Sequence, residues 1–336
     1  MRKELEERRR SLFEGAEFGC ALFPNTHNYS QSFSYFAGCQ IDSSYLVLKP
    51  SGGVLFVHQM NYNQAKESSY YPVRKIAKDA IEEIKTACGR AKVGVCMREI
   101  SAAQFAAGKK AGLKLVEADR KVLSLRAQKS RQEAEFMANS ARIARKILEG
   151  FDPWEYRTEK EAAKALKMLA LQEGAEVCFE PIVASGKNAR FPHYHPAEAK
   201  ISDVVLVDFG VKHMRYCSDF TRCYFKSKNT PAFRDYEKCQ QVFWGIFEKL
   251  GQCSEGKEVA AIAKKEMERA GLPKLVHAIG HGVGLEVHEA PYLGANSKDK
   301  LGVGTVIALE PAAYKGTYGV RFEEMVILTQ KGWKLL

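Results

Sequence analysis

The chain has 336 residues, of which 46% are hydrophobic and 27% charged, a composition typical of a globular protein with room for two domains. Its net charge of +11 is spread along the chain rather than gathered in one block, so no nucleic-acid partner is expected. No run of about 18 apolar residues occurs, so no membrane span is expected. The charged first residues and nine scattered cysteines without a Cys-x-x-Cys pair predict a cytoplasmic protein with reduced thiols.

The first part of the chain, residues 1–124, predicts a small α/β domain. Two short apolar strands flank the turn signal Pro50-Ser-Gly-Gly, which indicates a β-hairpin. The elements expected after it are a helix over 62–88, a strand over 92–97, a helix over 101–111 and a strand over 113–116. No catalytic cluster is evident in this part, so function is expected in the second domain.

The second domain is expected to cover residues 125–336 and to begin with two helices. The first covers about 130–149 and ends at Gly150. The second begins at the capping-box sequence Thr158-Glu-Lys-Glu and ends near Gln172. The later elements expected are a loop over 180–199, strands over 203–210 and 216–225, helices over 232–250 and 256–270, and strands over 305–310 and 319–328.

Two aspartates stand on the first pair of these strands. Asp208 lies near the end of an apolar strand, and Asp219 follows it eleven residues later. In an antiparallel hairpin, an odd separation allows the two to face each other across the sheet. Because two like charges opposed on a half-buried sheet destabilise it, the arrangement predicts a cation between them.

The last two strands repeat this pattern with glutamates. Glu310 ends one apolar strand, and Glu323 and Glu324 lie within the next. The interval of thirteen residues from Glu310 to Glu323 is again odd and allows facing positions. Strand alternation does not choose between Glu323 and Glu324, because both faces of that strand carry apolar neighbours.

Three of the eight histidines, His277, His281 and His288, fall within one glycine-rich stretch, residues 275–291. Histidine is a common metal ligand, and glycines allow a close approach of the backbone. Four carboxylates carry about four negative charges, which match two divalent cations, and an added imidazole favours Mn, Fe, Co or Zn over Mg or Ca. The residues therefore predict a metal site in which two ions activate a water molecule.

The order Asp208, Asp219, His281, Glu310 and Glu323 resembles the ligand pattern of the pita-bread dinuclear metallopeptidases. This family includes methionine aminopeptidase, Xaa-Pro aminopeptidase and Xaa-Pro dipeptidase (prolidase). The resemblance rests on the local sequences Val207-Asp-Phe-Gly, Tyr216-Cys-Ser-Asp-Phe-Thr-Arg, Gly280-His-Gly-Val-Gly-Leu-Glu-Val-His-Glu-Ala-Pro, Leu309-Glu-Pro and Gly319-Val-Arg-Phe-Glu-Glu. The N-terminal part, with Tyr35-Phe-Ala-Gly-Cys, resembles the creatinase-type domain of the Xaa-Pro branch. The implied fold is an α/β creatinase-like N-terminal domain followed by an α+β pita-bread catalytic domain.

The resemblance also implies roles for the metal-binding residues. Asp208 would bind one metal, Asp219 and Glu323 would bridge both, and His281 and Glu310 would bind the second. Glu310 would in addition accept a proton from the attacking water. The choice of Glu323 over Glu324 follows from the resemblance alone.

Further roles are implied for the substrate side of the site. His193 would contact the substrate, with neighbouring His195 as a bystander, and His288 would hydrogen-bond the scissile carbonyl. His277 and Arg321 would line the proline pocket. Catalytic roles are thus implied for His193, His288 and Glu310.

The implied function is metal-dependent hydrolysis of the bond between an N-terminal residue and proline in small peptides, by a metal-bridging hydroxide in a homodimeric enzyme. Two alternatives are a methionine aminopeptidase-like activity and a non-enzymatic peptide- or nucleic-acid-binding module on the same fold. Ala312 departs from the pattern, because the family usually has glycine there. An added methyl group at this position bears on substrate preference. The sequence as a whole leaves open the native metal, the residue preferred before proline and the choice between dipeptides and longer peptides.

Overall fold

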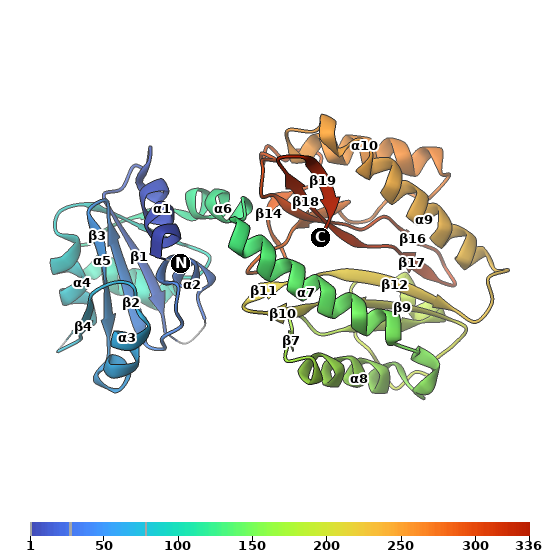
Figure 1. Ribbon diagram of the computed structural model, residues 1–336, viewed down its shortest axis with the longest axis horizontal. Helices are drawn as coiled ribbons and strands as arrows, with labels where there is room; N and C mark the ends of the chain where they lie inside the picture. The colour runs from blue at the N-terminus through green and yellow to red at the C-terminus, as the bar shows by residue number, and fades with distance from the viewer. Residues whose placement is uncertain (1, 27–28, 78) are drawn as a thin grey trace. The chain divides into compact units, whose positions relative to one another are not determined.

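The computed structural model describes residues 2–26, 29–77 and 79–336, and its contacts divide the chain into two compact units, Met1–Arg126 and Ala127–Leu336. The sequence placed the boundary after residue 124. Helix α6 (Asp119–Ala127) contains the observed division (Figure 1).

The first unit is built on a six-stranded mixed sheet with strand order β4-β3-β2-β1-β5-β6. Its strands are β1 (Cys20–Asn25), β2 (Ser44–Lys49), β3 (Gly52–Val57), β4 (Val73–Lys75), β5 (Lys92–Val95) and β6 (Lys114–Glu117). Its other helices are α1 (Arg2–Phe13), α2 (Gln31–Ala37), α3 (Tyr62–Ser68), α4 (Ala80–Cys88) and α5 (Ala102–Lys110). The hairpin expected around Pro50 is the pair β2–β3.

The single helix expected over 62–88 is wrong, because the structure divides this stretch into α3, β4 and α4. Pro72 lies just after α3, and proline disfavours helical backbone in the residue before it. Asp79 then caps α4, its side chain accepting a hydrogen bond from the backbone N–H of Ile81 at 2.8 Å. The spacing of the apolar residues was therefore misleading over 62–88. Pro72 was the signal that a helix could not continue through this stretch.

The second unit places strands between two pairs of helices (Figure 1). Helices α7 (Arg131–Gly150) and α8 (Glu159–Gln172) pack on strands β7, β8, β10 and β11, while α9 (Pro231–Phe247) packs on β16 and β17 and contacts α10 (Gly256–Arg269). The strands are β7 (Glu176–Val177), β8 (Ile182–Ser185), β9 (Val204–Phe209), β10 (Val211–His213), β11 (Tyr216–Cys217), β12 (Phe220–Phe225), β13 (Gly280–Gly282), β14 (Glu289–Tyr292), β15 (Val306–Leu309), β16 (Ala312–Tyr314), β17 (Gly319–Arg321), β18 (Glu324–Thr329) and β19 (Gly332–Leu335).

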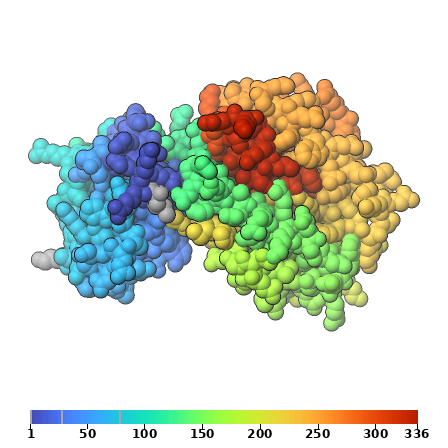
Figure 2. Space-filling view, viewed as in Figure 1, coloured from blue at the N-terminus to red at the C-terminus, as the bar shows by residue number. Residues whose placement is uncertain are grey.

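Of the four sheets that the described strands of this unit form, two supply most of the site. One has the order β14-β13-β15-β18-β19, and the other has the order β12-β9-β8. An apolar core that includes Phe243 and Val326, both fully buried, lies between the second pair of helices and the strands. The end of the chain is held on α7, where Arg145 donates to the backbone oxygen of Leu336, and in Figure 2 the green surface of α7 adjoins the red C-terminal strand.

Several strands of the second unit are interrupted where the sequence predicted continuous ones. The strand expected over 216–225 is divided into β11 and β12, with Asp219 in the gap, and the strand expected over 319–328 is divided into β17 and β18, with Glu323 in the gap. The strand expected over 305–310 ends at Leu309, so Glu310 also lies outside a regular strand. Each interruption therefore coincides with an acidic side chain singled out in the sequence.

None of the helices within the described ranges combines the length and the apolar character needed to cross a membrane.

Helix α8 offers a test of the packing in the second unit. Leu166 is fully buried in it, whereas Met168, two residues further on, is 51% exposed. We expect Leu166→Ala to lower the free energy of unfolding by about 3 kcal/mol, because it leaves a cavity, and Met168→Ala to change it by less than about 0.5 kcal/mol. Urea denaturation of the two variants measures the difference, and equal losses would contradict the packing described for α8.

Candidate metal centre

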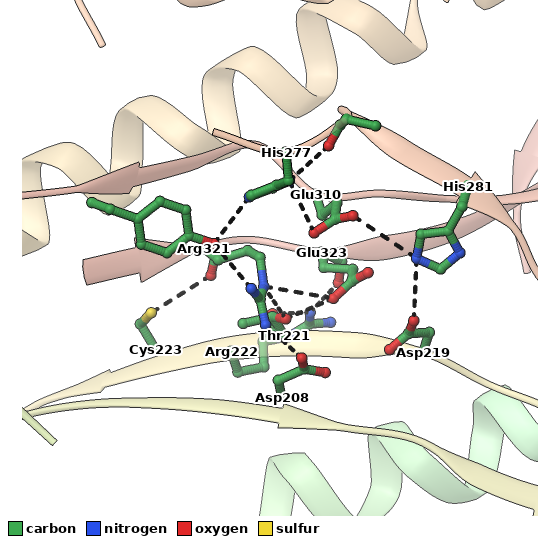
Figure 3. Close-up of polar contacts among 12 residues, drawn as sticks. Asp208, Asp219, Thr221, Arg222, Cys223, His277, His281, Glu310, Arg321 and Glu323 are labelled. Carbon is green, nitrogen blue, oxygen red and sulfur yellow. Dashed lines mark hydrogen bonds and ion pairs between the residues drawn. The ribbon is translucent and has the colours of Figure 1, made fainter. Parts of the chain in front are cut away.

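The structure brings the five residues predicted as metal ligands into one cluster inside the second unit (Figure 3). Three overlapping groups have potential ligand atoms within 4.8 Å of one another; they are Asp208–Asp219–Glu323, His281–Glu310–Glu323 and Asp219–His281–His288. His288 enters the third group, although the family resemblance implies a role toward substrate for it.

The hairpin that carries Asp208 and Asp219 has a register different from the expected one. Asp208 faces Thr221 across β9 and β12, not Asp219. The register is set by a two-residue turn at Met214 and Arg215, both with positive φ, and the sequence lacks the Asn-Gly signal that would have located this turn. Asp219 lies two residues before Thr221, which places it diagonally across from Asp208 on the same side of the sheet.

The glutamates follow the register expected from their spacing. Leu309 pairs with Glu324, and Ala312 pairs with Arg321, so one register continues on both sides of the interruption. Glu310 and Glu323 therefore stand opposite each other within this interruption. Together the two hairpins direct four carboxylates toward one point from two different sheets.

Glu323 and Glu324 take opposite directions, which resolves the ambiguity left by strand alternation. The carboxylate of Glu324 is held by Arg145 at 2.7 Å and by Arg222. The Oε2 atom of Glu323 instead accepts a hydrogen bond from the Thr221 hydroxyl at 2.6 Å and lies in the cluster. Arg222 also donates to the backbone oxygen of Glu323 at 2.8 Å, which fixes the chain between the two glutamates.

His281 occupies a bulge in β13, a strand that lies close against β15. A Cβ atom at Gly280 would come within 2.0 Å of the Ala308 oxygen, so glycine is required at this contact. The Nδ1 atom of His281 lies 3.1 Å from the backbone oxygen of Gly282 and is assigned as the donor. This leaves Nε2 free to point at the carboxylates, 3.5 Å from Asp219 and 3.9 Å from Glu310.

The residues predicted for the substrate side surround the same cluster. A cavity of about 630 Å³ is lined by the ligand candidates and by His193, His195, His277, His288 and Arg321. The His288 ring lies edge-on to His281, with ring centroids 4.0 Å apart. His277 lies 3.5 Å from Glu310 through Nδ1.

Arg321 is buried, and it hydrogen-bonds residues of the cluster in addition to lining the cavity. Its guanidinium donates to Asp208 at 2.5 Å, to the Thr221 hydroxyl at 2.7 Å and to the Tyr314 hydroxyl at 2.9 Å (Figure 3). The Tyr314 hydroxyl also lies 3.1 Å from Nε2 of His277. Sequence reasoning missed Thr221 and Tyr314, although Tyr314 shares a strand face with Ala312, the residue that departs from the family pattern.

Burial and mutual repulsion act on the ionisable groups of the cluster. Burial raises the pKa of Asp208 to about 7 despite the opposing effect of Arg321. Burial and neighbouring carboxylates raise the pKa values of Asp219 and Glu310 well above their usual range, and burial lowers the pKa of His281 to about 3. A neutral imidazole beside clustered acids is the donor set that a divalent cation requires.

One buried oxygen supports the same interpretation. The Oδ1 atom of Asp208 has no hydrogen-bond partner among the described residues, although it is shielded from solvent. A buried polar atom without a partner is costly unless something else binds it. The orphan oxygen and the donor set together fit a divalent metal ion.

Two family models match the chain. The model "Metallopeptidase family M24" matches residues 135–330, which contain all five ligand candidates, and the model "Creatinase/Prolidase N-terminal domain" matches residues 7–128. The chain belongs to metallopeptidase family M24. Its predicted architecture, a creatinase-type N-terminal domain and a pita-bread catalytic domain, is thereby confirmed.

Curated relatives and solved structures agree with this family assignment. The chain is 30% identical over 239 residues to an uncharacterized peptidase of Methanocaldococcus jannaschii, covering 67% of this chain and 69% of the relative. It is 29% identical over 313 residues to the Xaa-Pro dipeptidase of Pyrococcus furiosus, covering 90% and 89%. The solved structure of an Xaa-Pro dipeptidase from Bacillus anthracis matches with a TM-score of 0.88 at 26% identity, over 100% of this chain and 97% of that one. As an M24 metallopeptidase, the chain is a hydrolase that uses divalent metal ions.

The raised pKa values of the acids give a pH prediction for this M24 site. The pKa of Asp208 is raised from 3.8 to about 7, and those of Asp219 and Glu310 are raised well above their usual range, so these three acids bind more protons in the metal-free folded protein than in the unfolded chain. The lowered pKa of His281 acts in the opposite direction, but three acids outweigh this one imidazole, and stability falls as pH rises through about 7. We expect the melting temperature of chelator-treated protein to be higher near pH 5 than near pH 8, and added Mn²⁺ to reduce this difference because it binds the ionised carboxylates.

Two aspartate variants control for the other titrating groups. Asp208→Asn should flatten the pH dependence of the metal-free protein, whereas Asp203→Asn, at a side chain that is 78% exposed, should not. A metal-free protein that gains stability from pH 5 to pH 8 would contradict the electrostatic account.

Proposed function

We propose that this M24 enzyme hydrolyses the peptide bond between an N-terminal residue and proline in small peptides. The observation that carries the proposal is the convergence of the four acids and His281 on one point, beside a cavity that His277, His288 and Arg321 also line. The relatives named Xaa-Pro dipeptidase, which align over about nine-tenths of the chain, support the substrate class. Neither the methionine aminopeptidase alternative nor the non-enzymatic alternative is favoured by these comparisons.

In this proposal Asp208, Asp219, His281, Glu310 and Glu323 hold two divalent metal ions. Bound there, the ions would polarise the scissile carbonyl and lower the pKa of a water molecule. Glu310 would accept a proton from that water, and its two carboxylate oxygens each lie within 4 Å of an imidazole, that of His277 or that of His281. Asp219 and Glu323, from two different sheets, would each help to hold both ions.

The surrounding residues would orient the substrate. A bond to proline is a tertiary amide without an N–H group, so the site must act on the carbonyl and on the departing nitrogen. His288 stands next to His281 and can donate to the scissile carbonyl. His193 also lines the cavity and would contact the substrate, while His277 and Arg321, which line it too, would border the proline ring.

Arg321 has a second role in the proposal, as a fixed counter-charge. It holds one oxygen of Asp208 by a 2.5 Å hydrogen bond, which leaves the orphan oxygen Oδ1 for a metal ion. Its further hydrogen bond to Tyr314 connects the metal side of the site to His277.

The remaining expectations also belong to the proposal. The mixed carboxylate–imidazole donor set supports Mn, Co, Fe or Zn as the native metal. No disulfide links the cysteines within the described residues, which supports a reducing, cytoplasmic location. A homodimer rests on the family resemblance, and analytical ultracentrifugation of the purified chain tests it.

A peptide panel tests the substrate class. We expect metal-loaded enzyme to cleave Ala-Pro and Met-Pro faster than Met-Ala, and Ala-Pro-Ala reports whether longer peptides are accepted. The measurement is kcat/KM for each peptide across Mn²⁺, Co²⁺, Fe²⁺ and Zn²⁺. Absence of cleavage of every proline-containing peptide, with metal shown to be bound, would remove the proposed function.

Ligand substitutions test the metal roles. Asp208→Ala and His281→Ala should each lower kcat/KM by at least about 10³-fold, because the ions and their activated water are lost or displaced. Metal content measured by mass spectrometry should fall in parallel, while the exposed-site variant Asp203→Asn keeps both. A variant that retains full turnover with two bound ions would remove that residue from the ligand set.

His288 and His195 both line the cavity, so His195 provides a matched control for a test of the carbonyl-binding role of His288. We expect His288→Ala to lower kcat by about 10²-fold with metal content unchanged, since a donor to the developing oxyanion is lost. His195→Ala should leave kcat near the wild-type value. Equal effects of the two substitutions would contradict the role given to His288.

A further inference from the structure

The proposed substrate residue His193 lies on a segment that lacks regular structure. Residues 191–199, here named the histidine loop, follow the short 3₁₀ helix Gly186–Arg190 and contain no helix or strand. The side chains of His193, Tyr194 and His195 nevertheless line the cavity. A loop without backbone pairing of its own must be held by other groups to keep a side chain in position.

The side chain of Glu159 supplies such an anchor. Glu159 is fully buried at the start of α8 and accepts hydrogen bonds from several different segments. Its Oε1 accepts from the Ser185 backbone N–H at 2.7 Å and from the Asn188 amide at 3.0 Å. Its Oε2 accepts from the Tyr194 hydroxyl at 2.8 Å and from the Ala197 backbone N–H at 3.3 Å.

These contacts reach residues on both sides of His193 in the chain. Ser185 ends β8 before the histidine loop, Tyr194 is the immediate neighbour of His193, and Ala197 lies three residues beyond Tyr194. The Asn188 amide also donates to the Tyr194 hydroxyl at 2.9 Å, which closes the network. One carboxylate thus joins both sides of the loop and the residue next to the histidine.

The backbone at the start of α8 adds two further contacts to the same loop. The N–H of Glu159 donates to the oxygen of Ala199 at 3.0 Å, and the N–H of Lys160 donates to the oxygen of Ala197 at 3.1 Å. No ion pair to Glu159 occurs within the described part of the chain, so its charge is balanced by hydrogen bonds and by the positive end of the helix. A buried carboxylate that binds loop groups rather than a cation is suited to fix that loop.

We propose that Glu159 is a positioning residue that fixes the histidine loop and thereby places His193 against the substrate. The inference rests on the proposed function, in which His193 contacts the peptide. Glu159 lines no part of the cavity and touches no proposed metal ligand among the contacts described, so its effect on turnover passes through the loop.

The experiment compares Glu159→Gln with a control on the same helix. In Glu159→Gln one carboxylate oxygen becomes an amide nitrogen, which accepts no hydrogen bond, so either the Ala197 N–H or the Ser185 N–H loses its acceptor. The control is Glu161→Gln, an exposed residue whose carboxylate accepts only from the Arg157 backbone among the hydrogen bonds of the described residues. With Mn²⁺-loaded enzyme and Ala-Pro, we expect Glu159→Gln to lower kcat/KM about tenfold, mainly through KM, at unchanged metal content. The control should keep the wild-type value.

A double-mutant cycle with His193→Ala distinguishes positioning from a general loss of stability. If Glu159 acts through His193, Glu159→Gln should change kcat/KM by less than about twofold when His193 is already absent. The same factor in both backgrounds would overturn the inference. Should Glu159→Gln not fold, Tyr194→Phe removes one of the donors and should show a smaller decrease with the same dependence on His193.

Hydrogen–deuterium exchange provides a measurement that does not depend on activity. Amides in residues 186–199 should exchange faster in Glu159→Gln than in wild type and in Glu161→Gln. If wild-type enzyme cleaves no Xaa-Pro peptide, the proposed function fails, and the exchange measurement still decides the anchoring role. Unchanged exchange in residues 186–199 would overturn it.

Discussion

The structure of the second unit depends on one constraint, the burial of four carboxylates beside one imidazole. Like charges at this spacing repel, and burial strengthens the repulsion because the local dielectric is low. Arg321 offsets part of the charge through its 2.5 Å contact with Asp208, and its Nε lies 3.9 Å from Glu323. One guanidinium cannot balance four acids, so the fold is shaped for additional positive charge that a divalent metal ion supplies.

This constraint accounts for the interruptions in the strands. A continuous strand alternates its side chains between two faces, and its ladder hydrogen bonds fix that alternation. Asp219, Glu310 and Glu323 all lie in gaps between strands, where the backbone has freedom to turn a carboxylate inward. The pairs β15–β18 and β16–β17 keep one register on the two sides of the gap at Glu310 and Glu323, so strand pairing continues around the two acids.

The sequence allowed much of the site to be predicted, and the errors have physical causes. Acids on apolar strands and a glycine-flanked histidine predicted a metal site. Burying such side chains costs free energy unless a bound cation or another partner compensates for it. The facing pair Asp208–Asp219 was wrong because the register depends on the turn at Met214 and Arg215, two residue types that give no turn signal. Thr221 and Tyr314 were missed because their importance arises from contacts with Arg321 between hairpins, which no local pattern reports. The choice of Glu323 required the family resemblance, whereas the structure explains it through the pairing of Glu324 with Arg145 and Arg222.

The backbone therefore holds the two groups of site residues in two different ways. The ligand candidates stand on or beside paired strands, whose backbone hydrogen bonds limit their movement. The groups proposed to contact substrate differ, since His193 stands on a loop and His288 on the turn that leads into β14. Metal ions tolerate little displacement of their ligands, whereas peptides must enter and leave, so a loop held by the side-chain contacts of Glu159 suits the substrate side. The buried hydrogen-bond network at the start of α8 then limits how far that loop can move.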